Sequence, residues 1–288
     1  MQEVLVQDTT IAARDGFVLG ATVFTPESAP RAVVLINSAT AVPRRIYRGF
    51  AGYLAGRGYA ALTYDYRGTG DSRPASLRRF EARMRDWAAL DVAGAIDHVR
   101  RVWAAQPLYV VGHSFGGQAV GLVPNNREIE RALLVAAQSG YWRFYLTPFE
   151  RARVWAMFRL VTPPVVQVMG YAPGWLGLGE DLPRGVFLEW RDWCMKRGFF
   201  FDDPTLEATA NFARYSGPLR AVGIDDDPWA TRQAIDALVA HFASADVQRV
   251  QIEPRRLAAG PIGHFGFFRR ERRDTLWRDA VDWLSNPA

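Results

Sequence analysis

The sequence predicts an α/β fold in which a mostly parallel central sheet is flanked by helices. Short, continuous apolar runs alternate with amphipathic helical segments at the spacing of parallel strand–helix–strand units. The 288 residues are 49% apolar and 13% aromatic, which is enough to bury a sizeable core. One long segment of different texture separates two of the apolar runs. These observations favour one core domain that carries an inserted helical unit.

The first elements are expected to form an antiparallel hairpin at an edge of the sheet. Residues 4–6, 9–13 and 17–25 alternate or run apolar on either side of the turn Arg14-Asp15-Gly16. Residues 32–37 then form a continuous apolar run, which is typical of a strand buried on both faces.

The remaining core elements follow in strand and helix alternation. An amphipathic helix over residues 47–57 ends at Gly58. The further expected strands are 59–64, 108–111, 132–137, 219–224 and 247–252, and the further helices are 87–102, 231–242 and 274–284. The chain has no internal repeat.

The segment from residue 139 to residue 216 is rich in aromatic residues and has helical patterns but no convincing strand. Thr147, Pro148 and Glu150 predict a helix start with a capping box, and that helix should run to about residue 161. Connections between core strands are usually a few residues long, so this segment predicts a cap. We therefore assign residues 1–138 and 217–288 to the core and residues 139–216 to a helical cap over the functional site. A few of its aromatic side chains are expected to line a pocket, and its glycine-rich stretch 174–179 lacks the context of a phosphate loop.

The charge pattern argues against a nucleic-acid partner. The formal net charge is +5, but the arginines are scattered and interleaved with acids, and Lys196 is the only lysine. Cys194 is alone, so no intramolecular disulfide is possible. The first residues lack a basic region followed by an apolar core, and Arg159 interrupts the most apolar later run. These features predict a cytoplasmic protein without stable membrane insertion.

The sequence Gly112-His113-Ser114-Phe115-Gly116 lies between an apolar strand and a helix of small residues. This spacing predicts a tight strand-to-helix turn that exposes the hydroxyl of Ser114 and aims the helix N-terminus at a reacting carbonyl. Ser114 is therefore the candidate nucleophile.

A serine hydroxyl needs a base, and that base works best when a carboxylate orients it. His264 is the candidate base, because it lies in a glycine-flanked loop after the last strand. His98 and His241 fall in helical patterns and are expected at the surface or in packing, and His113 is expected to be structural. The acid should follow the strand 219–224, where Asp225, Asp226 and Asp227 are all candidates.

The serine, aspartate and histidine occur in the order and at the intervals of the α/β-hydrolase fold. The stretches GHSFG (112–116), DYRGTGDS (65–72), DDDP (225–228) and IGHFGFF (262–268) resemble the capped serine-hydrolase branch of that superfamily. This branch includes monoacylglycerol lipases, esterases and serine aminopeptidases. The sequence is most similar to a bacterial group of predicted α/β hydrolases without assigned substrates. The resemblance covers the core well and the cap poorly, and it implies that Asp227 is the triad acid, with Asp225 as the alternate.

The sequence departs from this family at the loop after residues 32–36. Relatives usually have His-Gly there, whereas this chain has Asn37-Ser38-Ala39-Thr40. The expected oxyanion donors are the N–H groups of Phe115 and Ala39. The resemblance also implies that the loop 65–72 is structural, and we expect Arg44 and Arg45 to lie in a solvated loop.

Together these residues predict a serine hydrolase that needs no metal or cofactor. Ser114, His264 and Asp227 would cleave an ester or thioester through an acyl-enzyme. The aromatic cap favours a small-molecule substrate with an apolar acyl or aryl group.

Other functions remain compatible with the same residues. Amide hydrolysis, carbon–carbon bond hydrolysis and acyl transfer use the same triad. From other functional classes, the alternatives are a non-catalytic ligand-binding protein on this fold and an interaction module that uses the arginine-rich surface. The intact serine, histidine and acid argue against the ligand-binding protein, and the interaction module would bind polyanions in a salt-sensitive way that does not depend on Ser114.

Overall fold

A computed structural model describes residues 4–257 and 260–285 of the chain. An eight-stranded sheet forms the centre, with the strand order β1-β2-β4-β3-β5-β6-β9-β10. β2 runs antiparallel to both of its neighbours, and every other neighbouring pair is parallel. The strands are β1 (Val4–Ala12), β2 (Val18–Pro26), β3 (Val33–Asn37), β4 (Ala60–Tyr64), β5 (Leu108–His113), β6 (Arg131–Val135), β9 (Pro218–Ile224) and β10 (Asp246–Ile252).

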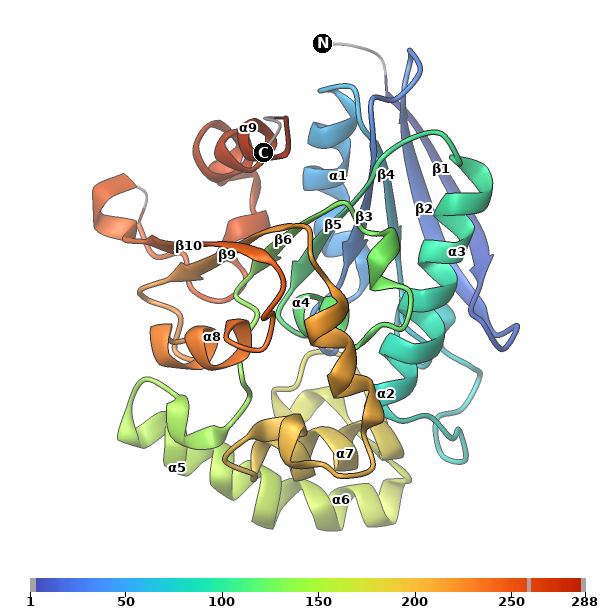
Figure 1. The fold of residues 1–288 in the computed structure, drawn as a ribbon. Helices are drawn as coiled ribbons and strands as arrows, with labels where there is room; N and C mark the ends of the chain where they lie inside the picture. Colours follow the sequence, from blue (N-terminus) through green and yellow to red (C-terminus); the bar gives the residue numbers. More distant parts are fainter. Residues whose placement is uncertain (1–3, 258–259, 286–288) are drawn as a thin grey trace.

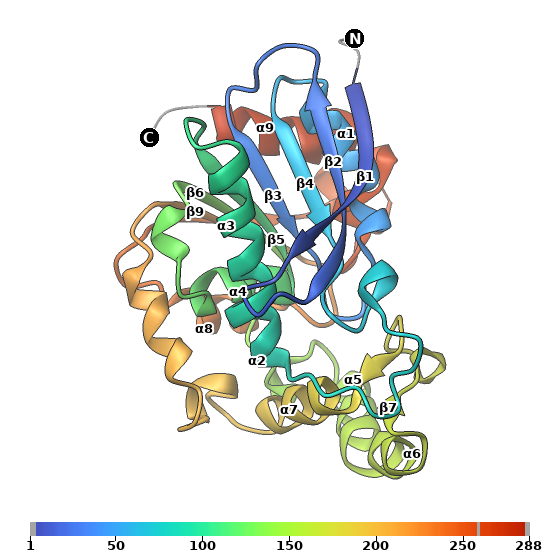
Figure 2. The ribbon, with the colours of Figure 1, turned by 90° about the vertical axis from the view of Figure 1, so that its right-hand side faces the viewer.

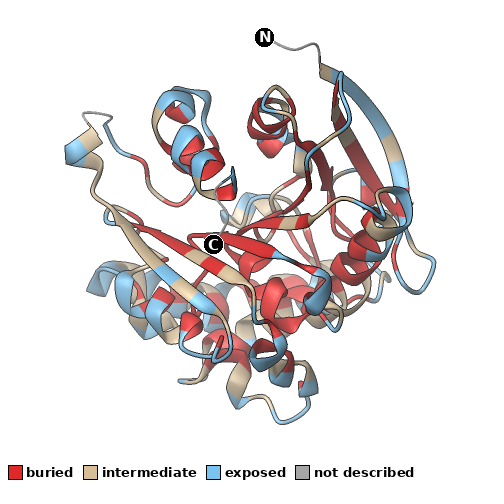
Figure 3. Cartoon of the chain, turned by 45° about the horizontal axis from the view of Figure 1, so that its top comes forward, coloured by how far each residue is buried: buried red, intermediate tan, exposed pale blue. Residues whose placement is uncertain are grey.

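The predicted α/β fold is confirmed, including the N-terminal hairpin at the sheet edge. Every residue of β3, β4 and β6 is buried, which explains why these strands are continuous apolar runs without alternation. The outer strands β1 and β10 carry exposed and half-buried residues instead, as Figure 3 shows.

Helices cover both faces of the sheet (Figure 2). α1 and α9 lie side by side on one face, and the ring of Phe50 on α1 is 5.5 Å from the ring of Trp277, just before α9. α3, α4 and α8 pack on the other face. Three of the helical runs include a turn of π-helix, over Trp87–Val92, Met157–Val161 and Arg273–Trp277. The core helices are α1 (Arg48–Ala55), α2 (Met84–Asp86), α3 (Ala93–Val102), α4 (Phe115–Leu122), α8 (Arg232–Val239) and α9 (Arg278–Ser285).

The segment between β6 and β9 forms a layer of helices at one end of the sheet (Figure 1). It contains α5 (Pro148–Ala156), α6 (Thr162–Met169) and α7 (Arg184–Cys194). The predicted helix start is confirmed, because the Thr147 hydroxyl accepts a hydrogen bond from the Glu150 N–H at 3.1 Å. None of the described helices is both long and apolar enough to span a membrane.

The expectation of no strand in this segment was wrong. β7 (Tyr171–Ala172) and β8 (Leu182–Pro183) form a two-stranded antiparallel pair. Two residues per strand are too few to produce a recognisable alternation in sequence. The segment's last helical turns, Glu207–Arg214, pack against α4 of the core, where the Asn211 side chain donates to the Leu122 carbonyl at 2.9 Å.

Candidate active site

Ser114 lies at the sharp turn between β5 and α4. Its backbone has φ 51° and ψ −115°, a left-handed conformation that strains any residue with a side chain. The turn also requires glycine on both sides. A Cβ on Gly116 would lie 2.2 Å from the Asn37 carbonyl oxygen, and one on Gly112 would lie 2.5 Å from the Gly116 carbonyl oxygen. The sequence therefore folds into the turn that its glycine spacing predicts.

His264 and Asp227 form a buried pair. The His264 Nδ1 and the Asp227 Oδ2 are 2.7 Å apart, and the other carboxylate oxygen accepts from the N–H groups of Trp229 (2.9 Å) and Ala230 (3.0 Å). Burial alone would raise the pKa of Asp227. The charge and hydrogen bond of His264 and the two backbone bonds outweigh that effect and hold the pKa of Asp227 below its ordinary value. The carboxyl group therefore stays ionised beside the imidazole.

The other two aspartates of the run have different partners. Asp225 pairs with Arg232 at 2.8 Å near the surface. Asp226 accepts from the backbone N–H groups of Ile262 and Gly263, both at 2.8 Å. Asp226 therefore anchors the loop that carries His264.

His264 is held among aromatic rings and lines the same cavity as Ser114. The rings of Trp229, Phe265 and His113 each lie 5.0 Å from its imidazole. Only 7% of His264 is exposed. The structure thus brings the predicted nucleophile and the predicted His–Asp pair to one cavity.

His113 belongs to a buried chain of hydrogen bonds that joins two loops of the site. Its Nε2 is 2.9 Å from the His264 carbonyl oxygen, and its Nδ1 is 2.8 Å from the Tyr47 hydroxyl. A carbonyl oxygen only accepts, so Nε2 carries the proton, Nδ1 accepts from Tyr47, and the Tyr47 oxygen accepts the Ala39 N–H at 2.9 Å. Burial, with the neighbouring His264, lowers the pKa of His113 to about 3, which keeps the ring neutral. We call Ala39, Tyr47, His113 and the His264 carbonyl the loop relay.

Ala39, one of the two predicted oxyanion donors, belongs to the loop relay. Ala39 lines the cavity, but its N–H already donates to Tyr47. Thr40 lines the same cavity, and neither its N–H nor that of Phe115 has a partner among the described residues. No local sequence pattern predicts this bond, because Tyr47 lies eight residues further on, just before α1.

The cavity has a volume of about 250 Å³. The inserted segment supplies most of its apolar wall, through Val154, Met157, Phe158, Leu176, Leu178 and Trp190. Among the described residues that line the cavity, the one arginine is Arg153, which is paired with Glu150 at 2.7 Å. As predicted, only a few of the segment's aromatic side chains reach the cavity.

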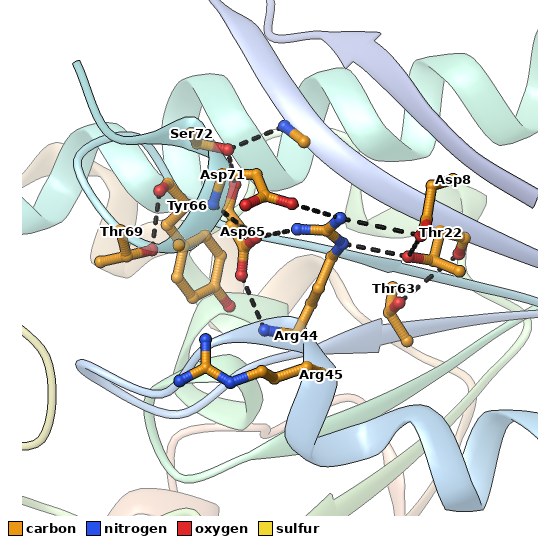
Figure 4. Close-up of polar contacts among 12 residues, drawn as sticks. Asp8, Thr22, Arg44, Arg45, Thr63, Asp65, Tyr66, Thr69, Asp71 and Ser72 are labelled. Atoms are coloured by element: carbon orange, nitrogen blue, oxygen red, sulfur yellow. Dashed lines mark hydrogen bonds and ion pairs between the residues drawn. The ribbon is translucent and has the colours of Figure 1, made fainter. Parts of the chain in front are cut away.

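Side chains of the loop 65–72 form hydrogen bonds with main-chain groups of the same loop and of neighbouring segments (Figure 4). Asp65 accepts from the N–H groups of Arg44 at 2.7 Å and Asp71 at 3.0 Å. The Ser72 hydroxyl donates to the Asp65 carbonyl at 2.7 Å and accepts from Gly20 at 2.9 Å. These bonds agree with the structural role expected for this loop.

The expectation that Arg44 is solvated was wrong. Its side chain is 11% exposed and pairs with both Asp65 and Asp71 (Figure 4). The side chain of Arg45 is 70% exposed. Arg44 therefore ties the end of the loop 38–44 to the loop 65–72. Within residues 4–257 and 260–285, no group of three or more His, Cys, Asp or Glu side chains is placed to hold a metal ion.

Comparisons with known proteins agree with this architecture. A family model described as "Alpha/beta hydrolase family" matches residues 33–280. Three esterase structures are similar to the whole chain. They are a thermophilic esterase from Thermogutta terrifontis with malate bound (15% identity, 96% of this chain and 98% of that one, TM-score 0.58), Est1E from Butyrivibrio proteoclasticus with ferulic acid bound (16%, 96% and 97%, 0.63), and an esterase from Exiguobacterium antarcticum (14%, 97% and 100%, 0.61). No curated protein matches the sequence.

Proposed function

Since the chain belongs to the alpha/beta hydrolase family, a family of hydrolases, we propose that it is a serine hydrolase acting on an ester or thioester with an apolar acyl or aryl group. The observation that carries this proposal is the buried His264–Asp227 pair at the cavity that Ser114 also lines. A histidine paired with a carboxylate, lining the same cavity as a serine with a strained backbone, is the arrangement that activates a hydroxyl group.

In the proposed mechanism, the Ser114 hydroxyl attacks the acyl carbonyl and gives its proton to Nε2 of His264. Asp227 holds the imidazole through Nδ1 and stabilises its positive charge. The protonated His264 then gives the proton to the leaving alcohol or thiol, and an acyl-enzyme remains. A water molecule, deprotonated by His264, releases the acid and restores the serine.

The negative charge on the tetrahedral intermediate needs donors that are free in the resting enzyme. We assign this role to the N–H groups of Phe115, at the start of α4, and Thr40 in place of Ala39. The N–H of Phe115 has the added favourable field of a helix N-terminus.

Residues 139–216 are proposed to act as a cap over this site. Their side chains supply the apolar wall opposite Ser114, which supports burial of an apolar acyl or aryl group. The proposal places catalysis in the core and substrate selection in the inserted segment.

Active-site labelling combined with turnover tests this function. Wild type, Ser114→Ala and the control Ser216→Ala, an exposed serine, would be treated with a fluorophosphonate probe and with p-nitrophenyl esters of increasing acyl length. We expect labelling and turnover in wild type and Ser216→Ala and neither in Ser114→Ala. Wild type that neither labels nor turns over any ester or thioester would refute the proposal.

A further inference from the structure

Two glutamines interrupt the apolar lining of the cavity. Gln118 on α4 is 4% exposed and Gln138, after β6, is 7% exposed, and both line the cavity. The side-chain carbonyl oxygen of each is buried without a hydrogen-bond partner in the described part of the chain. An unpaired buried acceptor costs about 1–3 kcal/mol, and native proteins leave few of them.

The orientation of the Gln118 amide is fixed. Its Nε2 donates to the main-chain carbonyl of Gln138 at 2.7 Å, and a flipped amide would bring two oxygens together. The side chain therefore offers an acceptor, not a donor. The Gln138 side-chain amide forms no hydrogen bond with any residue that the structure describes.

Both glutamines line the cavity that the proposed nucleophile also lines. Gln118 is four positions after Ser114, and its N–H donates to the Ser114 carbonyl at 3.2 Å. The main chain of Gln118 is thus bonded directly to that of Ser114, and a substrate whose carbonyl lies at Ser114 occupies the cavity that both glutamines line.

We infer that Gln118 and Gln138 form a subsite for a hydroxyl or amide N–H of the substrate, a few bonds from the carbonyl that Ser114 attacks. This inference rests on the proposed function and narrows its substrate class to polar-substituted acyl esters or to esters of polar-substituted alcohols. The hydroxyl of Tyr145, which lines the same cavity and has no partner in the described residues, adds a further polar group to this wall. The remaining wall accommodates the apolar part of the same substrate.

Isosteric ester pairs test the subsite and distinguish its two forms. Methyl 3-hydroxybutanoate and methyl 3-methylbutanoate differ in one hydroxyl on the acyl side. Propyl butanoate and 2-hydroxyethyl butanoate differ in one hydroxyl on the alcohol side. Hydrolysis in a pH-stat gives kcat/KM for each ester with wild type, Gln118→Met, Gln138→Met and the control Gln233→Met, which changes an exposed residue outside the cavity.

For one of the two pairs, the ratio of kcat/KM for the hydroxylated ester to kcat/KM for its apolar partner should be about fivefold to tenfold higher in wild type than in Gln118→Met or Gln138→Met. This factor corresponds to one buried hydrogen bond. Gln233→Met should retain the wild-type ratio. Equal ratios in wild type and both glutamine variants, for both pairs, would overturn the inference.

Two outcomes separate this inference from the proposed function. If fluorophosphonate labels Ser114 and the apolar esters are cleaved while the ratios do not change, only the subsite is refuted. If wild type is neither labelled nor active, the hydrolase proposal fails first. If Gln118→Met does not fold, because the main-chain carbonyl of Gln138 loses its donor, the ester ratios of Gln138→Met decide on the subsite. The side-chain amide of Gln138 makes no hydrogen bond to a described residue that this substitution would remove.

Discussion

The two walls of the cavity are held by different interactions. On the core wall, hydrogen bonds and tight backbone contacts fix Ser114, His264 and Asp227. On the wall from the inserted segment, rings and aliphatic side chains pack on one another, as where the rings of Phe158 and Trp190 lie 5.0 Å apart. Hydrogen bonds are directional, whereas apolar contacts depend mainly on buried area.

We expect this difference to separate the residues that set the rate of catalysis from those that set the substrate preference. A small change in the direction of the His264–Asp227 bond would disturb proton transfer, so the core wall tolerates little substitution. The apolar wall tolerates swaps that keep its volume. We therefore expect mutations on the core wall to change the rate for all substrates and mutations on the other wall to change the order of substrates.

The largest expected effect is that of Asp227→Asn. An amide in place of the carboxylate cannot stabilise the imidazolium, and its N–H₂ group favours the wrong tautomer of His264. We expect kcat to fall about 10³-fold to 10⁴-fold for every ester, with KM changed much less. Steady-state kinetics across an acyl-length series would measure both parameters.

Asp225→Asn is the matched control, because it changes the same side chain two positions away. Asp225 pairs with Arg232 at the surface and does not touch His264. Its activity should remain close to that of wild type. A loss in Asp225→Asn as large as that in Asp227→Asn would mean that the His264–Asp227 geometry is not the one used in catalysis.

The next effect concerns acid stability and the loop relay. Because the folded-state pKa of His113 is lowered to about 3, the unfolded chain binds this proton first as the pH falls below 6.5. Stability is then lost on acidification, by about 2 kcal/mol between neutral pH and pH 5. Urea unfolding at the two pH values should give a smaller difference for His113→Gln, and NMR should show the ring neutral at pH 5 in wild type. A ring that titrates near 6.5 in the folded protein would contradict the relay geometry.

Tyr47→Phe removes the centre of the loop relay. The Ala39 N–H and the His113 Nδ1 would then lie buried without a partner, at a cost of about 1–3 kcal/mol in the free energy of unfolding. Because the relay joins the loops on both sides of Ser114, we also expect kcat to fall by about tenfold for all esters. Urea unfolding and steady-state kinetics would report the two effects.

Tyr53→Phe provides the comparison with a second tyrosine, in the helix α1 that follows Tyr47. The Tyr53 hydroxyl is buried, but no described residue bonds to it. Its removal should leave stability unchanged or increase it, and kcat should not change. If both tyrosine variants behave alike, the hydroxyl of Tyr47 has no special positioning role.

Sequence patterns predicted the parts of the site that follow local rules. The glycines around Ser114 are required by contacts within the turn itself, and the hairpin and the buried strands follow from side-chain periodicity. The choice of the triad acid among three adjacent aspartates after one strand depended on the family resemblance alone. The structure gives each its own partner, because the chain turns sharply between them.

Other parts depend on residues that are distant in sequence, and no local pattern marks them. The partner of Ala39 is a tyrosine just before α1, and Arg44 binds carboxylates of another loop. The amide of Gln118 meets the carbonyl of Gln138, twenty residues later. The contacts of Arg44 and Gln118 exist only once the sheet order has placed β4, β3, β5 and β6 next to one another.

The smallest expected effect lies on the apolar wall. Leu178 lines the cavity from the inserted segment, so Leu178→Ala should enlarge the space for the acyl group. Each buried methylene contributes about 0.8 kcal/mol, roughly fourfold in affinity. The kcat/KM optimum in a p-nitrophenyl ester series should therefore move to acyl chains one or two carbons longer, with a change of a few fold and little change in kcat. Leu160→Ala, on an exposed residue of the same segment that does not line the cavity, should keep the wild-type optimum. A uniform loss of rate in Leu178→Ala, with the optimum unmoved, would show that this wall serves catalysis and would remove the contrast between the two walls.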